Sequence, residues 1–133
     1  MKPHYQVAAA LIFENGRVFA AKRGKTKYAY TSFRYEFPGG KIEDGENGKQ
    51  ALERELIEEL SMKVQVGNLY ASNTFEYPDF IVTLWLYECD RLSNYTLNEH
   101  VAVDWILPKD LKEEEWAPAD KDVIGALKRI FGE

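Results

Sequence analysis

Residues 37–62 read FPGGKIEDGENGKQALERELIEELSM, and the rest of the chain is best interpreted from this segment. Apolar side chains recur at helical spacing across residues 47–60, with good helix formers between them, so the pattern predicts an amphipathic helix. Glu55, Glu58 and Glu59 are related by i+3 and i+4 spacing and therefore share one face of that helix. We expect the helix to bury its other side and to present these three carboxylates away from the core.

The apolar arc of this helix is expected to hold Leu52, Leu56, Ile57 and Leu60. The acidic arc needs a partner, because like charges at this spacing repel by roughly a few tenths of a kcal/mol per pair. Mg²⁺ or Mn²⁺ fits best, since both prefer oxygen ligands and the segment has no His or Cys for a zinc site. The alternative is a surface helix with solvated glutamates.

Two further charged residues belong to the same region. Arg54 lies beside the acidic cluster and can orient or partly neutralise one carboxylate. Glu46 stands at the junction between the preceding loop and the helix, so it can reach the same side or act in the first turn.

The segment resembles the Nudix box, G-x5-E-x7-R-E-U-x-E-E-x-G-U with U a bulky aliphatic residue, which is the signature of the Nudix (MutT-like) hydrolases. The matching residues are Gly40, Glu46, Arg54, Glu55, Leu56, Glu58, Glu59 and Met62. At ordinary residue usage, a chance match in this chain has a probability of roughly one in a hundred thousand or less. The resemblance implies a Nudix fold and hydrolysis of nucleoside diphosphates linked to another group.

One position departs from the motif, because Ser61 stands where the family has its second glycine. This position comes just past the helix, where a left-handed backbone is common, and a serine there costs about 1 kcal/mol. The departure bears on folding rather than on chemistry. We therefore expect Ser61→Gly to raise stability and to leave turnover intact.

The resemblance continues outside the box. Residues 37–41 match the FPGGK that precedes it in MutT-like proteins, and Arg23 stands where those proteins have a phosphate-contacting arginine. Glu99 resembles the late glutamate that completes their metal site. Residues 117–120, Ala-Pro-Ala-Asp, look like their base-reading segment. Nearly the whole chain is covered, which favours the MutT-like subgroup.

MutT-like enzymes cut nucleoside triphosphates to the monophosphate and pyrophosphate. The resemblance implies one or more Mg²⁺ (or Mn²⁺) ions that bridge the phosphates and acidify the attacking water. The implied metal ligands are Glu55, Glu58, Glu59, Glu99 and the Gly39 carbonyl. Glu55 is the first choice of general base and Glu99 the second. Arg54 is expected to orient a glutamate and Arg23 to contact a phosphate, unless Arg23 is only an exposed side chain at a strand end.

Asp120 is the candidate for reading the base. An ionised carboxylate only accepts hydrogen bonds, which suits the exocyclic amine of cytosine or adenine or the N–H of an oxidised guanine. The alternative role for Asp120 is a helix N-cap. The Pro-Ala-Asp form resembles CTP pyrophosphohydrolases, whereas 8-oxo-dGTP-cleaving members often carry asparagine, so we favour a cytidine or modified pyrimidine nucleotide. Tyr77 and Phe37 are candidates for stacking on the base, with core packing as the alternative.

The remaining sequence predicts a mixture of strands and helices. β-branched and aromatic runs predict strands at 5–13, 18–21, 35–37, 62–66, 69–75, 80–89 and 102–107. The connecting segments are a hairpin turn at 14–17, a mobile polar loop at 24–31, a turn or short helix at 108–111, a solvated charge run at 112–115 and a second helix at 119–131. Without a regular βαβ alternation, the class is α+β, with a mixed sheet between helices in one domain, residues 1–133.

Composition limits the partners. The 133 residues carry a net charge of −5 with no block of basic residues, which argues against a nucleic-acid polymer or an anionic membrane as partner. The N-terminal residues lack the apolar core of a signal peptide, and the longest apolar run, 7–13, is too short to cross a bilayer, so we expect a cytoplasmic protein. The single cysteine, Cys89, is predicted to be a buried thiol.

The expected partner is therefore a small nucleotide, and the oligomeric state, monomer or homodimer, stays open. A nucleotide pool-sanitising 8-oxo-dGTP diphosphatase is the alternative within the same activity. A non-catalytic nucleotide-sensing Nudix module is a rival of another class, which the intact glutamates disfavour. ADP-ribose or dinucleoside polyphosphate hydrolysis is disfavoured by the short chain.

Overall fold

The computed structural model describes residues 1–132. The main elements are β1 (His4–Leu11), β2 (Phe13–Glu14), β3 (Arg17–Lys22), β4 (Tyr35–Glu36), β5 (Gly39–Lys41), α1 (Gly48–Leu60), β6 (Val64–Glu76), β7 (Ile81–Arg91), β8 (Ala102–Ile106) and α2 (Lys121–Phe131). Three 3₁₀ turns connect β8 to α2: η1 (Pro108–Asp110), η2 (Glu113–Glu115) and η3 (Pro118–Asp120). The predicted α+β class is confirmed.

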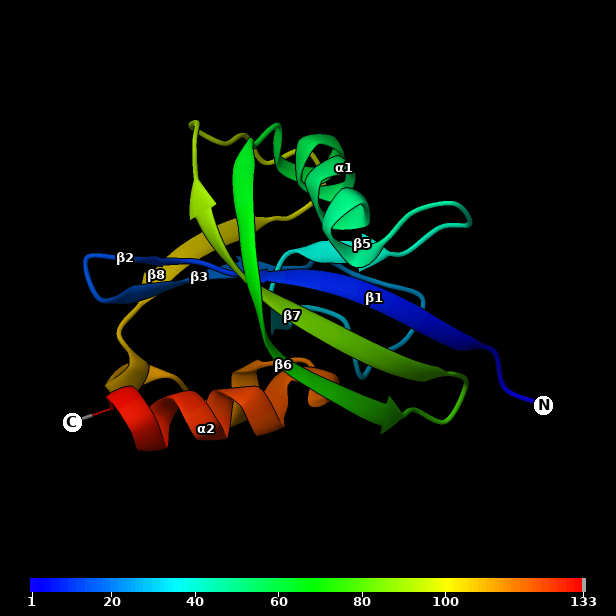
Figure 1. Cartoon of the computed structure of the whole chain (residues 1–133). Helices are drawn as coiled ribbons and strands as arrows, with labels where there is room; N and C mark the ends of the chain where they lie inside the picture. The colour runs from blue at the N-terminus through cyan, green and yellow to red at the C-terminus, as the bar shows by residue number, and fades with distance from the viewer. Residues whose placement is uncertain (133) are drawn as a thin grey trace.

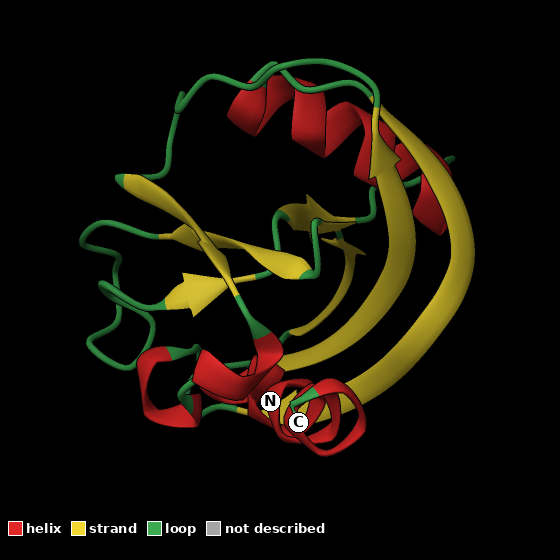
Figure 2. Cartoon of the chain, turned by 90° about the vertical axis from the view of Figure 1, so that its left-hand side faces the viewer, coloured by secondary structure: helices red, strands yellow, loops and turns green. Residues whose placement is uncertain are grey.

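The strands form two sheets. The first has the order β5-β1-β7-β6 and is mixed, because β1 runs parallel to β7 while β5 and β6 are antiparallel to their neighbours. In the second, β3 pairs antiparallel with β2, β4 and β8. The long strands β6 and β7 curve strongly (Figure 2), and α1 and α2 lie on opposite sides of the strands (Figure 1). The predicted mixed sheet between helices is confirmed.

Strand β1 explains why both sides are covered. Its alanines alternate in direction, so that Ala8 and Ala10 join the core beneath α1 while Ala9 and Leu11 join the core beneath α2. A strand that is buried on both faces has a continuous run of apolar residues in its sequence, and residues 7–13 form such a run. The small alanines let both helical layers approach the sheet.

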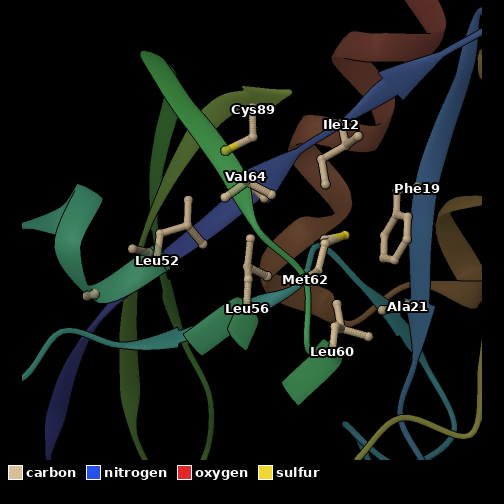
Figure 3. Close-up of a cluster of buried hydrophobic side chains, with 12 residues drawn as sticks. Ile12, Phe19, Ala21, Leu52, Leu56, Leu60, Met62, Val64 and Cys89 are labelled. Carbon is tan, nitrogen blue, oxygen red and sulfur yellow. The ribbon is translucent and has the colours of Figure 1, made fainter. Parts of the chain in front are cut away.

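The core beneath α1 is built from the predicted leucines. Leu52, Leu56 and Leu60 are fully buried and gather with Met62 and neighbouring strand residues (Figure 3). Burial of each leucine contributes about 1.5–3 kcal/mol. Cys89 belongs to the same cluster, which confirms the predicted buried thiol.

Helix α1 begins and ends at identifiable signals. Asn47 is the N-cap, and its side chain accepts a hydrogen bond from the Gln50 backbone N–H at 2.9 Å, while the Gln50 side chain accepts one from the Asn47 N–H at 3.0 Å. The helix ends at Ser61, whose backbone is left-handed with φ 51° and ψ 35°. The left-handed conformation expected at this position is confirmed.

Three local expectations are corrected. Ile57 is 46% exposed, because it lies outside the arc of the three buried leucines. Strand β5 forms at Gly39–Lys41, outside the predicted strands, since glycine allows close pairing with β1. β6 is one strand with irregular pairing near residues 66–71 rather than two strands. The predicted solvated charge run at 112–115 is confirmed, because all four residues are exposed, and residues 113–115 within it form the turn η2. No helix of residues 1–132 is long and apolar enough to cross a membrane.

Candidate active site

The four glutamates predicted for the site lie together near the end of α1. Glu55, Glu58 and Glu59 come from the helix itself. Glu99 lies near enough that its charge contributes to raising the pKa of both Glu55 and Glu59. The Asn98 backbone N–H donates to the Glu59 carbonyl at 3.1 Å, which holds the Glu99 segment against the last helical turn.

Arg54 connects the carboxylates on the open side of the helix. Its Nε and Nη2 donate to the two oxygens of Glu46 at 2.7 and 2.9 Å, and its Nη1 donates to Glu55 at 2.9 Å and to Glu58 at 3.2 Å. The bonds from Arg54, with that from the Glu43 backbone N–H, lower the pKa of Glu46 to about 2. This arrangement is the one that an orienting arginine requires.

Two glycines bring the main chain of β5 against the cluster. A Cβ on Gly39 would overlap the Ala8 carbonyl oxygen, and a Cβ on Gly40 would overlap the Glu55 carboxylate. No other residue type fits at either position without displacing the strand or the glutamate. The backbone of Gly40 therefore lies directly against the Glu55 carboxylate.

Glu59 differs from the expectation that all three helical carboxylates point away from the core, because it is only 6% exposed. Seven residues at 100° each place it about 20° from Leu52 on the helical wheel, within the buried arc. Burial, followed by repulsion from Glu36, Glu55 and Glu99, raises the pKa of Glu59 to about 9. A buried carboxylate of this kind requires either a cation or a proton.

Two polar side chains of the site were missed from the sequence. Glu36 of β4 and His100, which precedes β8, lie in contact, with 2.9 Å between Glu36 Oε2 and His100 Nε2. They form a cluster with Glu59 in which one donor atom from each residue lies within 4.8 Å of the others. A signal was present, since Glu36 directly precedes the FPGGK segment and His100 directly follows Glu99.

A cavity of about 530 Å³ adjoins the cluster. Six residues singled out from the sequence line it: Arg23, Phe37, Gly39, Gly40, Tyr77 and Asp120. Arg23 is 44% exposed at its side chain, and its Nε lies 3.4 Å from the Glu36 carboxylate. The fold thus brings the candidate phosphate contact, the candidate base contact and the glycines onto one cavity wall.

Asp120 lies in this wall and is 5% exposed. It stands at the N-cap position of α2, but its side chain makes no capping hydrogen bond, so the capping role is not observed. Burial raises the pKa of Asp120 well above its usual value, and the charge of Glu36 adds to this while that of Arg23 opposes it. This direction favours the neutral carboxyl relative to an exposed aspartate, and a neutral carboxyl both donates and accepts hydrogen bonds.

The two predicted stacking residues are packed against other rings. Tyr77 is 4% exposed, and its ring stacks on that of Tyr30 with the ring centroids 5.0 Å apart and the ring planes 15° apart. The Tyr77 hydroxyl accepts a hydrogen bond from the Ala119 N–H at 3.0 Å. Phe37 is 3% exposed, and the centroid of its ring lies 4.9 Å from that of Trp116. Both rings reach the cavity wall from the core, and their contact with a base stays a prediction.

The residues present fit a divalent cation. Several carboxylates converge, and Glu59 Oε1 is buried without a hydrogen-bond partner among the described residues. Oxygen donors of this kind suit hard divalent ions.

Comparison with known proteins agrees with this geometry. The NUDIX domain model matches residues 2–127. The 8-oxo-dGTP diphosphatase of Escherichia coli K12 is 35% identical over 127 residues, covering 94% of this chain and 97% of that protein. The CTP pyrophosphohydrolase of the same organism is 34% identical over 126 residues, covering 94% and 92%. The solution structure of the E. coli ORF135 protein superimposes with a TM-score of 0.83 at 32% identity, covering 97% of this chain and 91% of that one.

The matched range includes the glutamates of α1, the glycines of β5 and the cavity wall up to Asp120. The chain therefore belongs to the Nudix hydrolase family, in its MutT-like branch.

Proposed function

We propose that the protein is a nucleoside triphosphate pyrophosphohydrolase that uses Mg²⁺ or Mn²⁺ to convert NTP and water to NMP and diphosphate. The observation that carries the proposal is the single cavity whose wall includes both Asp120 and the two glycines, one of which touches Glu55. A nucleotide can thus reach a base-contacting group and the acidic cluster at once. We also propose that residues 1–133 form one catalytic domain, which the match over residues 2–127 supports, and that this domain acts in the cytoplasm.

The chain supplies the following groups to this reaction. Glu55, Glu58, Glu59, Glu99 and the Gly39 carbonyl are the proposed cation ligands. A divalent ion bound there supplies charge neutralisation for the phosphates and lowers the pKa of the attacking water. Arg23 lines the cavity, which supports the proposal that it donates to a phosphate oxygen.

Glu55 is the proposed proton acceptor, with Glu99 as second choice. Burial raises the pKa of Glu55, while the hydrogen bond and the charge of Arg54 lower it. The hydrogen bond from Arg54 Nη1 also fixes the direction of the Glu55 carboxylate. A general base works best when its pKa approaches the operating pH, and burial acts in that direction. Arg54 is a positioning residue in this scheme.

For the substrate we favour CTP, dCTP or a modified pyrimidine nucleotide, with 8-oxo-dGTP as the alternative. A neutral Asp120 carboxyl offers one donor and one acceptor, which complement N3 and the 4-amino group of cytosine. The same pair complements O6 and N7–H of 8-oxoguanine. The relatives at 34% and 35% identity are named for these two substrates, which supports keeping both.

A nucleotide panel tests the proposal. Canonical and modified nucleoside triphosphates are scored by pyrophosphate release with and without Mg²⁺, next to a variant carrying Glu58→Gln and Glu59→Gln. We expect metal-dependent turnover by the wild type and loss of at least about a hundredfold in the variant. Absence of turnover with every nucleotide would favour the non-catalytic sensing module and refute the proposal.

Variants of Asp120 test the base contact and its protonation state. Asp120→Asn keeps one donor and one acceptor, so we expect kcat/KM for the preferred nucleotide to stay within about threefold of the wild type. Asp120→Ala leaves the base edge unpaired and should cost about 10- to 100-fold. An equal loss in both variants would instead show that the ionised form is needed. Equal rates for cytosine, guanine and oxidised guanine nucleotides would rule out base reading by Asp120.

A further inference from the structure

The cluster of Glu36, Glu59 and His100 is built differently from the predicted metal site. It combines one residue from β4, one from the last turns of α1 and one from the loop before β8, and only Glu59 is shared with the Nudix box. Two of its members are more than nine-tenths buried, with Glu59 at 6% and His100 at 7% exposure. A group of two carboxylates and an imidazole at this depth needs an explanation.

Unpartnered atoms point to a ligand. Among residues 1–132, three buried side-chain polar atoms lack a hydrogen-bond partner, and two of them are Glu59 Oε1 and His100 Nδ1 of this cluster. Leaving a buried polar atom unpaired costs about 1–3 kcal/mol. Among the arginines and lysines of residues 1–132, Arg23 is the one that pairs with the Glu36 carboxylate, with its Nε 3.4 Å from Oε1. The cluster therefore combines two carboxylates, and one oxygen of Glu59 is buried in it without a partner.

The spacing suits a bound ion. Metal bonds of about 2.0–2.2 Å to nitrogen and oxygen place neighbouring donors about 3 Å apart and opposite donors about 4.3 Å apart. The three donor atoms lie within 4.8 Å of one another, and His100 Nε2 lies 2.9 Å from Glu36 Oε2. An ion can therefore be accommodated with small side-chain shifts.

The imidazole selects the kind of ion. Mg²⁺ prefers oxygen ligands and retains its waters, whereas first-row transition ions accept imidazole nitrogen more readily. Mn²⁺ is the weakest binder of that series and the one nearest to Mg²⁺ in its preference for oxygen, which suits a site of two carboxylates and one imidazole. We propose that Glu36, Glu59 and His100 form a mixed nitrogen–oxygen site for a divalent transition-metal ion such as Mn²⁺, adjacent to the cation site of the Nudix glutamates. Because Glu59 is shared, this inference rests on the proposed function for the identity of the neighbouring site.

The loop that carries His100 is fixed by the ends of other elements. The Thr96 N–H donates to the Leu60 carbonyl at 2.7 Å, the Asn98 N–H to the Glu59 carbonyl at 3.1 Å, and the Val101 N–H to the Lys22 carbonyl at 2.9 Å. These bonds on both sides of His100 hold the loop between α1 and β3. The site is thus preorganised by the backbone rather than by a ligand.

A Mn²⁺ titration without nucleotide, followed by the electron paramagnetic resonance signal of free Mn²⁺, tests the site. The protein has two histidines, so His4→Gln is a matched control for His100→Gln. We expect the tightest class of Mn²⁺ site to weaken by about 10- to 100-fold in His100→Gln and in Glu36→Gln, with the wild-type isotherm retained in His4→Gln. Mg²⁺ affinity should change less than about threefold in His100→Gln. Identical Mn²⁺ isotherms for the wild type and His100→Gln would overturn the proposal.

A second measurement needs no variant and covers the case in which His100→Gln does not fold. Substoichiometric Mn²⁺ is added to the wild type while the imidazole resonances are followed by nuclear magnetic resonance. We expect selective broadening of His100 over His4, and equal broadening of the two would overturn the proposal. Pyrophosphate release is measured separately with Mg²⁺ alone, so failure of the proposed function and failure of this site give different results.

Discussion

At the scale of single residues, Ser61 shows how a departure from a motif is accommodated. Its left-handed backbone is unfavourable for serine, yet its side chain makes a contact that glycine cannot make. Asn98 Nδ2 donates to Ser61 Oγ and to the Glu58 carbonyl, both at 3.0 Å. The serine therefore helps to attach the Glu99 segment to the end of α1.

These opposing contributions change the expected size of the Ser61→Gly effect. Relief of the left-handed strain contributes about 1 kcal/mol, and loss of the Asn98 bond removes about 0.5–1.5 kcal/mol. We expect unfolding in urea to show at most a small gain in stability, of about 0.5 kcal/mol, with unchanged turnover. In an Asn98→Ala background the same substitution should give the full gain of about 1 kcal/mol, and an equal effect in both backgrounds would exclude the coupling.

At the scale of elements, the helix α1 and its glutamates were predictable because their spacing is local. The i+3 and i+4 relations that place Glu55, Glu58 and Arg54 together need only a helix, and the sequence indicates one strongly. The helical wheel also places Glu59 within the buried arc, about 20° from Leu52. The i+3 and i+4 spacing alone groups Glu59 with the exposed carboxylates and so does not predict its burial. β5 was missed because proline and glycine have low strand propensity, and only the close approach to β1 shows why glycine is present.

The contact between Glu36 and His100 depends on strand pairing and could not be read from local pattern. Ala21 of β3 pairs with Glu36 of β4 on one side and with Val103 of β8 on the other. Residues separated by more than sixty positions therefore meet across a single strand. A sequence pattern identifies each strand, but pairing partners are set by the packed sheet.

The hairpin of β2 and β3 is attached to β7 by an ion pair that predicts a pH effect. Arg91 donates to both oxygens of Glu14, at 2.8 and 2.7 Å, and this bond lowers the pKa of Glu14. A glutamate whose pKa is lower in the folded state than in the unfolded state stabilises the fold at pH values above the unfolded-state pKa of 4.5. This stabilisation is lost as the pH falls through the folded-state pKa. We expect Glu14→Gln to reduce the unfolding free energy at pH 7 by about 1 kcal/mol or less, since the pair is partly exposed.

The measurement is thermal or urea unfolding of the wild type and Glu14→Gln at pH 7, 5.5 and 3.5. The difference between the two proteins should be largest at pH 7 and should shrink toward zero at the lowest pH. Glu53→Gln is the matched control, because Glu53 is exposed and makes no ion pair with residues 1–132. A difference that stays constant with pH would show that the pair does not contribute through the Glu14 charge.

At the scale of the whole molecule, the cavity is completed by segments far apart in the chain. The loop between β3 and β4 supplies Tyr28, and the turn between β6 and β7 supplies Asp79 and Phe80. The loop, which the sequence predicts to be mobile, has its own hydrogen bonds, including one from the Thr26 N–H to the Ser32 Oγ at 2.8 Å. The Tyr30 ring stacks on Tyr77 and the Tyr28 ring packs at a tilt on Phe80, so the loop and the turn form one aromatic wall of the cavity.

Tyr30 makes the polar contact that holds this wall together. Its hydroxyl donates to Asp79 Oδ2 at 2.7 Å, and its ring stacks on Tyr77 at 5.0 Å. Tyr30→Phe removes the hydrogen bond and keeps the stack, whereas Tyr30→Ala removes both. We expect hydrogen exchange at the hydrogen-bonded loop amides of Thr31 and Phe33 to accelerate about two- to fivefold in Tyr30→Phe, as for a partly exposed hydrogen bond, and further in Tyr30→Ala.

The amides of β1 serve as the internal control, because they belong to the sheet and open only with larger parts of the molecule. Their exchange should be unchanged in Tyr30→Phe. Acceleration confined to the loop would show that the Tyr30–Asp79 bond limits a local opening of the cavity wall, which is the mobility predicted from the polar sequence. Equal acceleration in the loop and in β1 would mean that the variant lowers global stability instead, and unchanged exchange in both would mean that packing of the rings alone keeps the wall closed.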